Sequence, residues 1–412
     1  MTIVDRSCRS CGRSPLTVIL DLGATPLANA LLTHEMLAAD EERFPLVLAF
    51  CDGCALAQIT ESVPAEKLFT EYLYFSSFSE TMVQHAEAIA ARLARERRLG
   101  AESLVIEVAS NDGYLLQFYR RAGIPVLGIE PARNIAQVAE RERGVSTLCE
   151  FFGSELGARL ASQNRQCDVL HANNVLAHVP DLNGFVRGVA SLLKDDGIAV
   201  VEVPYVRDMV ERLEFDTIYH EHLCYFSLTA LDQLFARHEL RIIDVERLEI
   251  HGGSLRVFAA HAHRSAERRP AVPTLLAQEA REGLSRAAYF ASFADRVHEL
   301  KGVLCTLLRD LKRAGCTIAA YGASAKGSTL LNTFGIGADV LDFVADRSTY
   351  KHDRYTPGTH LLVTAPERLL EARPDYVLLL TWNFEREILA QQSDYRGRGG
   401  KFVVPIPQVR VV

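Results

Sequence analysis

Apolar and polar positions between residues 80 and 204 alternate in a way that predicts repeated pairs of strands and helices. Short apolar runs bounded by turn residues predict buried strands, and apolar positions three and four residues apart predict the helices between them. The expected strands are 103–109, 126–130, 169–173 and 198–204, and the expected helices are 80–98, 114–122, 134–143 and 185–193, with a short element near Leu148. Strands that alternate with helices imply a mostly parallel, doubly wound α/β sheet.

The C-terminal part of the chain returns to this alternation after a hairpin and a long helical segment. Residues 241–248 and 255–261 are strand-like and are joined by His251-Gly252-Gly253-Ser254, which predicts an antiparallel hairpin at an edge of the sheet. Residues 274–314 predict one long helix that ends at Gly315. A glycine-rich turn at 322–327 then precedes an expected helix at 328–334, with strands at 317–321, 340–344, 361–363, 376–380 and 401–404. This pattern predicts a second, smaller α/β domain.

Four of the nine cysteines lie in the first 54 residues as two Cys-x-x-Cys pairs, Cys8 with Cys11 and Cys51 with Cys54. Two such turns can supply four thiolates to one zinc ion, and a site with four sulfur ligands is structural because no position stays open for water. The alternatives are two unrelated pairs, one of them redox-active, or a zinc ribbon that binds nucleic acid. The clustering predicts a zinc-binding domain at residues 1–70, followed by a central domain at 71–270 and a C-terminal domain at 271–412.

Composition limits the partners that this chain can have. Its 412 residues carry a formal net charge of −7, which argues against a groove for nucleic acid. There is no run of 18 apolar residues, so no membrane span is predicted, and the first residues lack the pattern of a secretory signal. We therefore expect a cytoplasmic protein with reduced cysteines and without a nucleic-acid or membrane partner. The sequence leaves the oligomeric state open, and we expect a monomer.

A turn of small residues follows the first strand of the central domain and opens a helix. It runs Glu107-Val-Ala109-Ser-Asn111-Asp112-Gly113, and such a turn lets backbone amides approach a ligand. Glu130 ends the next strand, 17 residues after Gly113, where an acid can hold both hydroxyls of a ribose. The spacing and Glu107 resemble motif I of the class I methyltransferases, which bind S-adenosylmethionine. The alternative is a Rossmann-like domain whose turn holds no ligand.

Two further segments supply candidate chemistry near this turn. Asn173 and Asn174 follow a strand at the carboxyl edge of the sheet, where they can bind the methionine part of the cofactor, and His178 can enter the same site. Tyr219-His220-Glu221-His222 is the densest run of titratable groups in the chain. A His–Glu pair can tune an imidazole to act as a general base. The alternatives are a second metal site and a solvated loop. A base beside a methyl donor favours carbon as the acceptor, because C-methylation needs a carbanion.

Together these motifs resemble the sugar C-methyltransferases that act at C3 of dTDP-linked 4-keto sugars in antibiotic biosynthesis. The matching segments, in chain order, are the cysteine quartet, 72–77, 107–113, 178–181, 219–222, 251–256 and 322–332. The resemblance implies a zinc-binding N-terminal domain, a class I methyltransferase domain and a Rossmann-like C-terminal domain that helps to bind the nucleotide sugar. It also implies active-site roles for Tyr219, Glu221, His222 and His178, with an aromatic residue from 72–75, for which we choose Tyr74. Ala109 departs from the glycine that many methyltransferases have there.

Substrate binding is expected from the hairpin and from the second glycine-rich turn. Lys326 precedes a helix within that turn and could meet the pyrophosphate of the sugar nucleotide. The alternatives are a vestigial turn for 322–327 and a plain hairpin tip for 251–256, and Trp382-Asn383 could be a base platform or a packing element. The candidate substrate-binding residues are His251, Ser254, Arg256, Ser324, Lys326, Gly327 and Asn332.

The function expected from these features is transfer of a methyl group from S-adenosylmethionine to carbon. His222, assisted by Glu221, would remove the C3 proton of a dTDP-linked 4-keto deoxysugar that carries a 3-amino or 3-hydroxy group. The first alternative is a methyltransferase of the same cofactor class that acts on oxygen or nitrogen of a nucleotide sugar. The second is a non-catalytic zinc-ribbon binding module.

Overall fold

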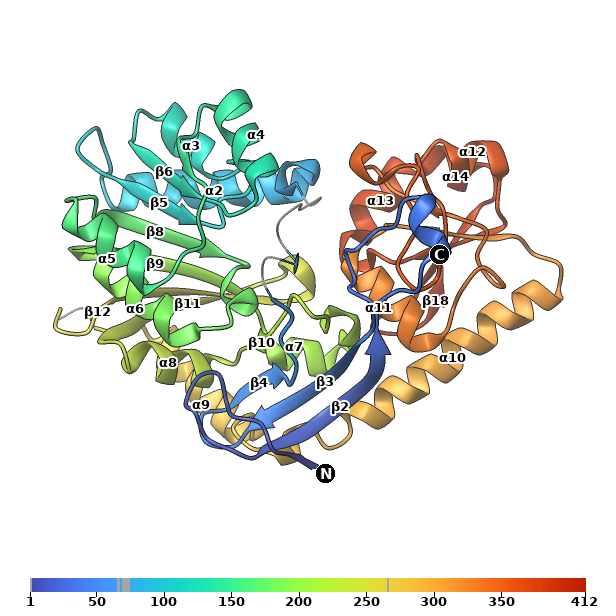
Figure 1. The fold of residues 1–412 in the computed structure, drawn as a ribbon, viewed down its shortest axis with the longest axis horizontal. Helices are drawn as coiled ribbons and strands as arrows, with labels where there is room; N and C mark the ends of the chain where they lie inside the picture. The colour runs from blue at the N-terminus through green and yellow to red at the C-terminus, as the bar shows by residue number, and fades with distance from the viewer. Residues whose placement is uncertain (1, 65–66, 69–74, 265–266) are drawn as a thin grey trace.

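The computed structural model describes residues 2–64, 67–68, 75–264 and 267–412, and these residues form three sheets. The largest hydrophobic core cluster reaches all three sheets, and a second cluster includes Val105, Val169 and Val200 of the central sheet together with α2. Figure 1 shows two α/β units side by side, with the N-terminal strands β2 and β3 running beneath and between them. Among the described residues, no helix is both long and apolar enough to cross a membrane.

The N-terminal sheet is antiparallel and takes its last strand from the central part of the chain. Its order is β1-β2-β3-β4-β10. The strands are β1 (Ile3–Val4), β2 (Leu16–Thr25), β3 (Phe44–Cys51), β4 (Leu56–Ile59) and β10 (Cys224–Tyr225). Because β10 begins two residues after His222, this sheet and the predicted acid–base cluster are physically connected.

The central sheet has the order β11-β12-β9-β8-β5-β6-β7, in which the five strands from β9 to β7 are parallel. Its strands are β5 (Val105–Val108), β6 (Val126–Ile129), β7 (Thr147–Leu148), β8 (Cys167–Asn173), β9 (Leu193–Pro204), β11 (Leu240–Leu248) and β12 (Ser254–His261). Both faces are covered, so β5 is buried at every position. The predicted hairpin is present, but only β11 lies at the edge, because β12 inserts antiparallel between β9 and β11.

Four helices around the central sheet lie close to the predicted segments, and three were not predicted. The amphipathic pattern of 80–98 becomes α2, which begins where the Ser79 hydroxyl accepts a hydrogen bond from the amide of Met82. The prediction did not include α5, α7 or α8. The helices are α2 (Glu80–Glu96), α3 (Leu116–Arg121), α4 (Arg133–Arg143), α5 (Ser154–Ser162), α6 (Leu182–Leu192), α7 (Val206–Glu211) and α8 (Leu228–Ala236).

The C-terminal sheet confirms the second α/β region, with the order β15-β14-β13-β16-β17-β18 and one antiparallel pair at β17 and β18. Its strands are β13 (Ile318–Tyr321), β14 (Val344–Ala345), β15 (Val363–Thr364), β16 (Tyr376–Leu379), β17 (Lys401–Val404) and β18 (Arg410–Val411). Its helices are α9 (Ala271–Glu282), α10 (Phe293–Arg313), α11 (Ala325–Phe334), α12 (Arg368–Ala372), α13 (Glu385–Gln391) and α14 (Ser393–Gly397).

Two predictions for this region were wrong in detail. The expected single helix at 274–314 is interrupted at Gly283, whose left-handed backbone ends α9 before α10 begins. The expected strand at 340–344 is mostly a turn, and only its last residue enters β14. Val340 and Leu341 are buried all the same, so their apolar character reflected burial and not strand pairing.

Candidate active site

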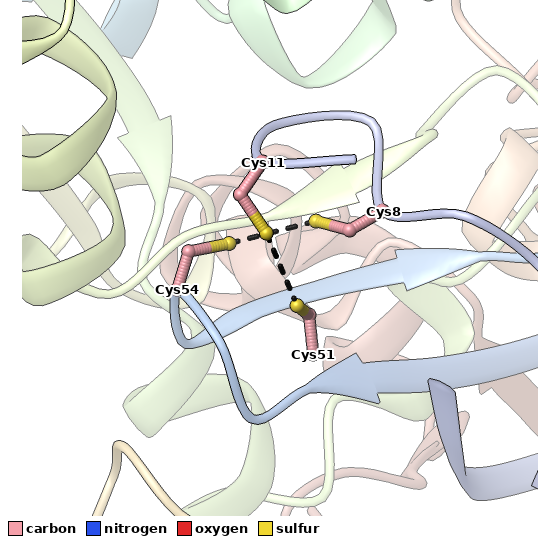
Figure 2. A group of neighbouring side chains, drawn as sticks. All are labelled: Cys8, Cys11, Cys51 and Cys54. Carbon is pink, nitrogen blue, oxygen red and sulfur yellow. Dashed lines mark hydrogen bonds between the residues drawn. The ribbon is translucent and has the colours of Figure 1, made fainter. Parts of the chain in front are cut away.

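The four N-terminal cysteines come together in space as a metal-binding cluster. Their sulfur atoms all lie within 4.8 Å of one another, and Figure 2 shows the side chains converging from two turns. Tetrahedral Zn–S bonds of about 2.3 Å place sulfurs about 3.8 Å apart, and the Cys8–Cys54 and Cys11–Cys51 pairs lie at 3.5 Å. Hydrogen bonds within the cluster lower the pKa of Cys51 and raise the pKa of Cys54 and Cys8. The residues therefore fit a structural zinc ion.

A cavity of about 620 Å³ opens where the three sheets meet, and its volume is typical of a site for small molecules. The predicted site residues that line it are Ala109, Asn111, Glu130, Asn173, Asn174, His178, Tyr219, His222, Ser324 and Lys326. The N-terminal part contributes Asn29 and Leu31. Residues from all three parts of the chain thus face one space.

The turn after β5 presents backbone to this cavity. Ala109 and Asn111 both have left-handed backbone, with φ of 53° and 49°. The carboxylate of Glu130 accepts hydrogen bonds from the amides of Asn111 at 3.0 Å and Ala132 at 2.9 Å. Burial raises the pKa of Glu130 to about 7, although these two amides oppose the shift. Glu130 is therefore fixed against the turn with oxygen lone pairs left for a ligand's hydroxyls.

Three other predicted cofactor residues lie outside the cavity lining. Among the described residues, Glu107, Asp112 and Gly113 do not line the cavity. Glu107 is buried in β5, and burial together with Asp112 raises its pKa well above the usual range, which favours the neutral acid. Asp112 is paired with Arg143 at 3.3 Å. Gly113 has a left-handed φ of 76°, and a Cβ there would press on Val145.

The carboxyl end of β8 supplies amide and imidazole groups to the cavity. The side-chain oxygen of Asn173 is buried without a hydrogen-bond partner among the described residues, so it can accept from a ligand's ammonium group. Burial lowers the pKa of His178 to about 4, against hydrogen bonds to the backbone of Glu221 and Asn174. His178 is therefore neutral at pH 7, and its ring lies 4.7 Å from that of His222.

The acid–base cluster contains a directional hydrogen-bonded chain. Nδ1 of His222 lies 2.9 Å from the carbonyl oxygen of Thr217, and a carbonyl can only accept, so Nδ1 carries the hydrogen. Nε2 is then the basic nitrogen, and the hydroxyl of Tyr219 donates to it at 2.8 Å. Because His222 is 9% exposed and lines the cavity, this chain brings a neutral imidazole and a phenol to the place where a substrate can bind.

The Glu221 side chain has a hydrogen-bond partner in the N-terminal region, and its expected role beside His222 stays a prediction. The Glu221 carboxylate accepts a hydrogen bond from the side-chain amide of Asn29 at 2.5 Å, and burial raises its pKa to about 7. His220 points into the N-terminal sheet, where Nε2 donates to the carbonyl of Pro45 at 3.1 Å. Tyr219 and His222, three residues apart, therefore face the cavity, whereas His220 faces the N-terminal sheet. The backbone of Thr217 accepts from Nδ1 of His222.

The second glycine-rich turn divides its predicted residues between the cavity and the packing of α11. Ser324 caps α11 by accepting from the amide of Gly327 at 3.1 Å, and Lys326 faces the cavity. A Cβ at Gly327 would lie 2.9 Å from Leu380, so this glycine permits close packing. Asn332 donates to the carbonyls of Ser328 and Pro357. Among the described residues, Gly327 and Asn332 do not line the cavity.

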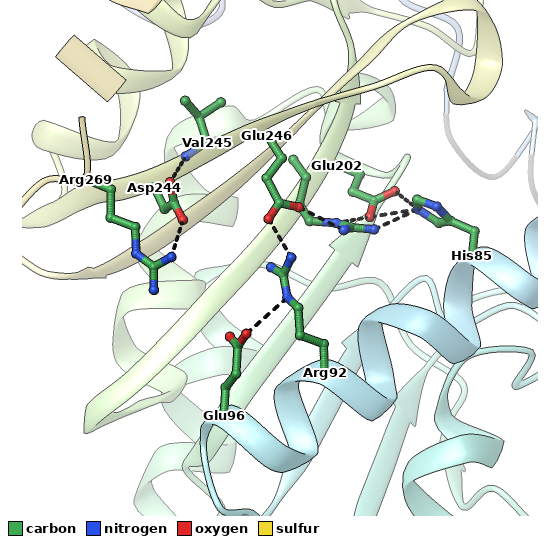
Figure 3. A network of polar contacts seen from close by, with 9 residues as sticks. His85, Arg92, Glu96, Glu202, Asp244, Val245, Glu246 and Arg269 are labelled. Carbon is green, nitrogen blue, oxygen red and sulfur yellow. Dashed lines mark hydrogen bonds and ion pairs between the residues drawn. The ribbon is translucent and has the colours of Figure 1, made fainter. Parts of the chain in front are cut away.

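Arg256 does not face a substrate, which corrects the expected phosphate contact. Figure 3 shows its neighbourhood as a network between α2 and the central sheet. Arg256 is 6% exposed and forms ion pairs with Glu202 at 2.6 Å and Glu246 at 3.0 Å. Its guanidinium also donates a hydrogen bond to Nε2 of His85 at 2.9 Å. Two carboxylates already pair with its charge, and loss of Arg256 would leave them unpaired in a buried place.

The remaining candidates are only partly described. Ser254 is buried, and its hydroxyl donates to the carbonyl of Ile250 at 3.1 Å, so it closes the hairpin. The side chain of His251 and the whole of Tyr74 lie outside the described residues. Phe75 is described, and its ring stacks on Tyr350 at 4.7 Å. The amide of Ser76 then donates to the Asn111 side chain at 2.9 Å, so this segment reaches the cofactor turn.

Sequence reasoning missed several groups that line the cavity. Asp346 directly follows β14 and accepts from the amides of Ala323 at 2.7 Å and Ser348 at 2.8 Å. Lys351 lies 3.6 Å from Asp346. The acid at the end of a strand beside a glycine-rich turn was the available signal for Asp346. Glu150, Phe151, Phe152 and Thr217 are among the other missed groups that line the cavity.

The strand order of the central sheet, its turn and its acid at the end of β6 define a class I methyltransferase. Comparison with known proteins agrees along the chain. Residues 8–69 match a zinc binding domain, 82–245 a methyltransferase domain and 249–407 the C-methyltransferase C-terminal domain. The chain is 38% identical to C-methyltransferase NovU of Streptomyces niveus over 405 residues, which cover 98% of this chain and 96% of that protein. It belongs to this C-methyltransferase family.

More distant similarities are confined to part of the chain. A ubiquinone biosynthesis O-methyltransferase of Bartonella quintana (strain Toulouse) is 26% identical over 97 residues, which cover 24% of this chain and 39% of that protein. The solved structure of magnesium protoporphyrin IX methyltransferase from Synechocystis PCC 6803 with bound SAM has a TM-score of 0.34 and 14% identity, covering 43% of this chain and 79% of that chain.

The protein is therefore an S-adenosylmethionine-dependent C-methyltransferase with a zinc-binding N-terminal region. The prediction of methyl transfer to carbon is confirmed. The two alternatives, an O- or N-methyltransferase and a non-catalytic zinc module, do not agree with this membership. The Glu130 carboxylate on the turn and the unsatisfied oxygen of Asn173 fit the ribose and ammonium groups of the cofactor.

Proposed function

We propose that this enzyme methylates C3 of a dTDP-linked 4-keto deoxysugar that carries an amino or hydroxyl group at C3, as a step in deoxysugar and antibiotic biosynthesis. The observation that carries the proposal is the Tyr219–His222–Thr217 chain, which places a basic nitrogen in the same cavity as the cofactor turn and Lys326. A base beside both binding regions suits a substrate whose carbon must lose a proton before it accepts methyl.

The cofactor's binding groups are assigned by their chemistry. Glu130 would accept the ribose hydroxyls, Asn173 and Asn174 the amino-acid end, and Phe151 and Phe152 the apolar adenine. When bound, S-adenosylmethionine supplies an electrophilic methyl group to a nucleophilic carbon. Glu107 and Asp112 do not contact the ligand in this proposal.

His222 is the proposed general base. Its Nε2 takes the C3 proton, either directly or through Tyr219, whose oxygen would receive that proton as its own passes to Nε2. In both routes the imidazole ends doubly protonated, and the C–H electron pair delocalises onto the 4-keto oxygen. Tyr219 can donate to that oxygen once Nε2 has gained the proton, whereas the single N–H of a neutral His178 is engaged by the backbone of Glu221 and Asn174. The Thr217 carbonyl then stabilises the positive imidazolium through Nδ1.

The C-terminal region would bind the nucleotide half of the substrate. Lys326 and Lys351 line the cavity and offer positive charge to a pyrophosphate, while Asp346 can accept a sugar hydroxyl. We keep the division at 1–70, 71–270 and 271–412 as the proposed domains, with the nucleotide held across the last two. A monomer stays our expectation.

The direct test is incubation with labelled S-adenosylmethionine and a panel of dTDP-4-keto sugars, with the new methyl group located by NMR. We expect methyl at C3, and exchange of the C3 proton with solvent in the absence of cofactor. His222→Gln should lower turnover and exchange by about 100- to 10,000-fold, the usual contribution of a general base. His298→Gln, on the exposed face of α10, is the matched control.

Comparing Tyr219→Phe with His222→Gln separates the two proton routes. If Tyr219 relays the proton, the phenylalanine variant should lose as much exchange as the glutamine variant. If Nε2 acts directly, Tyr219→Phe should keep most of it. Near-normal exchange in His222→Gln would overturn the assignment of the base.

A further inference from the structure

A short segment of the central region packs into the C-terminal region beside the active site. This segment is η4 (Phe215–Thr217). The ring of Phe215 stacks on Phe334 of α11 at 4.7 Å. Asp216 is fully buried, and its carboxylate accepts a hydrogen bond at 2.7 Å from the indole nitrogen of Trp382 in η8 (Trp382–Phe384). Two consecutive residues of η4 are thus held by the C-terminal region.

The third residue of η4 holds the proposed base. The carbonyl of Thr217 accepts from Nδ1 of His222 at 2.9 Å and from the hydroxyl of Tyr225 at 3.3 Å. A displacement of η4 would move this carbonyl. His222 would then lose the contact that keeps hydrogen on Nδ1 and leaves Nε2 basic, and tautomers of an imidazole are set by such contacts.

We propose that Asp216 and Trp382 are positioning residues of the reaction, because their hydrogen bond fixes the Thr217 carbonyl and with it the tautomer of His222. The inference rests on the proposed role of His222 as the base. Neither residue touches the reacting atoms, since each acts through Thr217. This gives Trp382 a role other than the base platform or packing element that its sequence position suggested.

The groups around this bond limit the effect of burial on Asp216. Burial raises the pKa of Asp216 to about 6, while the Lys326 ammonium and the indole donor oppose the shift. The Lys326 nitrogen itself lies 4.6 Å from the centre of the Trp382 ring, a cation–π distance. The indole therefore lies between the proposed phosphate-binding lysine and the carboxylate next to Thr217. Substrate binding and the orientation of the base share this one side chain.

The tautomer can be measured without turnover. In protein labelled with ¹⁵N-histidine, long-range ¹H–¹⁵N spectra distinguish the two nitrogens of each imidazole, and His222→Gln identifies the His222 signals. We expect wild-type His222 to carry hydrogen on Nδ1. In Trp382→Phe, which keeps an aromatic ring beside Lys326 but removes the N–H donor, we expect a mixture of tautomers. Tyr395→Phe is the matched control, because it removes a buried hydrogen bond of the same region, to the Pro374 carbonyl.

Steady-state kinetics and C3 exchange provide a second test of the proposal. Trp382→Phe should lower kcat and C3 exchange about tenfold, the usual scale for losing a hydrogen bond to a charged group, with less than about a twofold change in KM for the nucleotide sugar. A purely structural role predicts instead a lower melting temperature with an unchanged tautomer and kcat. That outcome, or a change in KM alone, would overturn the proposal.

A second variant keeps the test decisive if Trp382→Phe does not fold. Asp216→Asn fills the same space but offers the indole only a neutral acceptor, so we expect a smaller loss of kcat, about threefold, and a partial tautomer shift. An unchanged tautomer in this folded variant would also refute the proposal. If the wild type methylated no nucleotide keto sugar, the proposed function would fail, but the tautomer comparison would stand by itself.

Discussion

Two turns in this protein hold a carboxylate in the same way but present different charges to the cavity. In the central region, Glu130 accepts the amide of Asn111 in the turn and the amide two residues beyond itself. In the C-terminal region, Asp346 accepts the amide of Ala323 in its turn and again the amide two residues beyond itself. Each acid directly follows the strand that pairs in parallel with the strand before the turn.

The difference lies in the charged groups around each turn. Beside Glu130 the turn carries Asp112 and covers Glu107, and no lysine from it lines the cavity among the described residues. Beside Asp346 the cavity receives Lys326 and Lys351. The first arrangement suits a ligand with a cationic sulfonium and ammonium, and the second suits a pyrophosphate. One backbone device can thus serve two ligands, and the neighbouring charges select between them.

Zinc removal should produce the largest loss of turnover. It should disturb the loop that carries Tyr219 and His222 but leave ligand binding at both turns almost unchanged. Cys54 lies two residues before β4, and β4 pairs with β10. β10 begins two residues after His222. Losing a site whose binding free energy amounts to about 10 kcal/mol or more should disorder that sheet and lower turnover about 1,000-fold. The turnover of Cys54→Ser tests this expectation, and Cys305→Ser in α10 is the control variant. We expect S-adenosylmethionine and dTDP to bind in calorimetry within about threefold of wild type, and loss of both would contradict an independent role for the turns.

Charge reversal at the second turn should have the next largest effect. Lys326→Glu places a negative charge beside the pyrophosphate, and losing a charged contact of about 2.7 kcal/mol would weaken dTDP binding about 100-fold. Binding of S-adenosylmethionine should not change. Arg309→Glu, on the exposed face of α10, controls for the change in net charge. If both ligands weakened together in Lys326→Glu, the comparison between the turns would break down.

The two acids should show reciprocal effects. Glu130→Gln should weaken S-adenosylmethionine binding about tenfold and leave dTDP unchanged, because the amide can accept fewer hydroxyl hydrogen bonds and brings donors toward donors. Asp346→Asn should do the opposite. Titration calorimetry of both ligands with both variants gives four affinities. If either variant weakened both ligands equally, the assignment of Glu130 to S-adenosylmethionine and of Asp346 to dTDP would be refuted.

Cofactor affinity should depend on pH through Glu130. Burial raises its pKa to about 7, and the ionised carboxylate accepts ribose hydroxyls better than the acid does. Affinity should therefore rise as pH rises, about fivefold between about pH 6 and about pH 8. The Glu130→Gln variant should lose this dependence. A fall in affinity over the same range would show that another group dominates.

The smallest effect is expected at Ala109. Its φ of 53° is costly for a residue with a side chain, whereas the second turn has Gly322 at 97°. Ala109→Gly should relieve that strain but add freedom to the unfolded chain, so stability should change by less than about 0.5 kcal/mol. Denaturant unfolding and cofactor titration measure this. A large loss of cofactor affinity in Ala109→Gly would mean that the side-chain methyl group of Ala109 contacts the cofactor.

Much of the architecture could be predicted because it is encoded locally. The cysteine pairs, the alternation of strands and helices, and the strand–turn–helix of both α/β regions depend on residues close in sequence, whose spacing fixes burial and backbone geometry. Where local cues were ambiguous the prediction failed. Val340 and Leu341 were apolar in a turn, and Gly283 broke a helix that its neighbours continued.

The sequence by itself determined the metal ligands, the two turns and the segments that carry the chemistry. Only the tertiary structure decided which polar groups face the cavity. Lys326 does, whereas Arg256, equally plausible in sequence, is neutralised by two carboxylates of its own sheet. Glu221 meets Asn29 from 192 residues away, and Trp382 meets Asp216 from 166 residues away. Such partners depend on how separate elements pack, because a side chain's electrostatic surroundings are assembled from every element that reaches it.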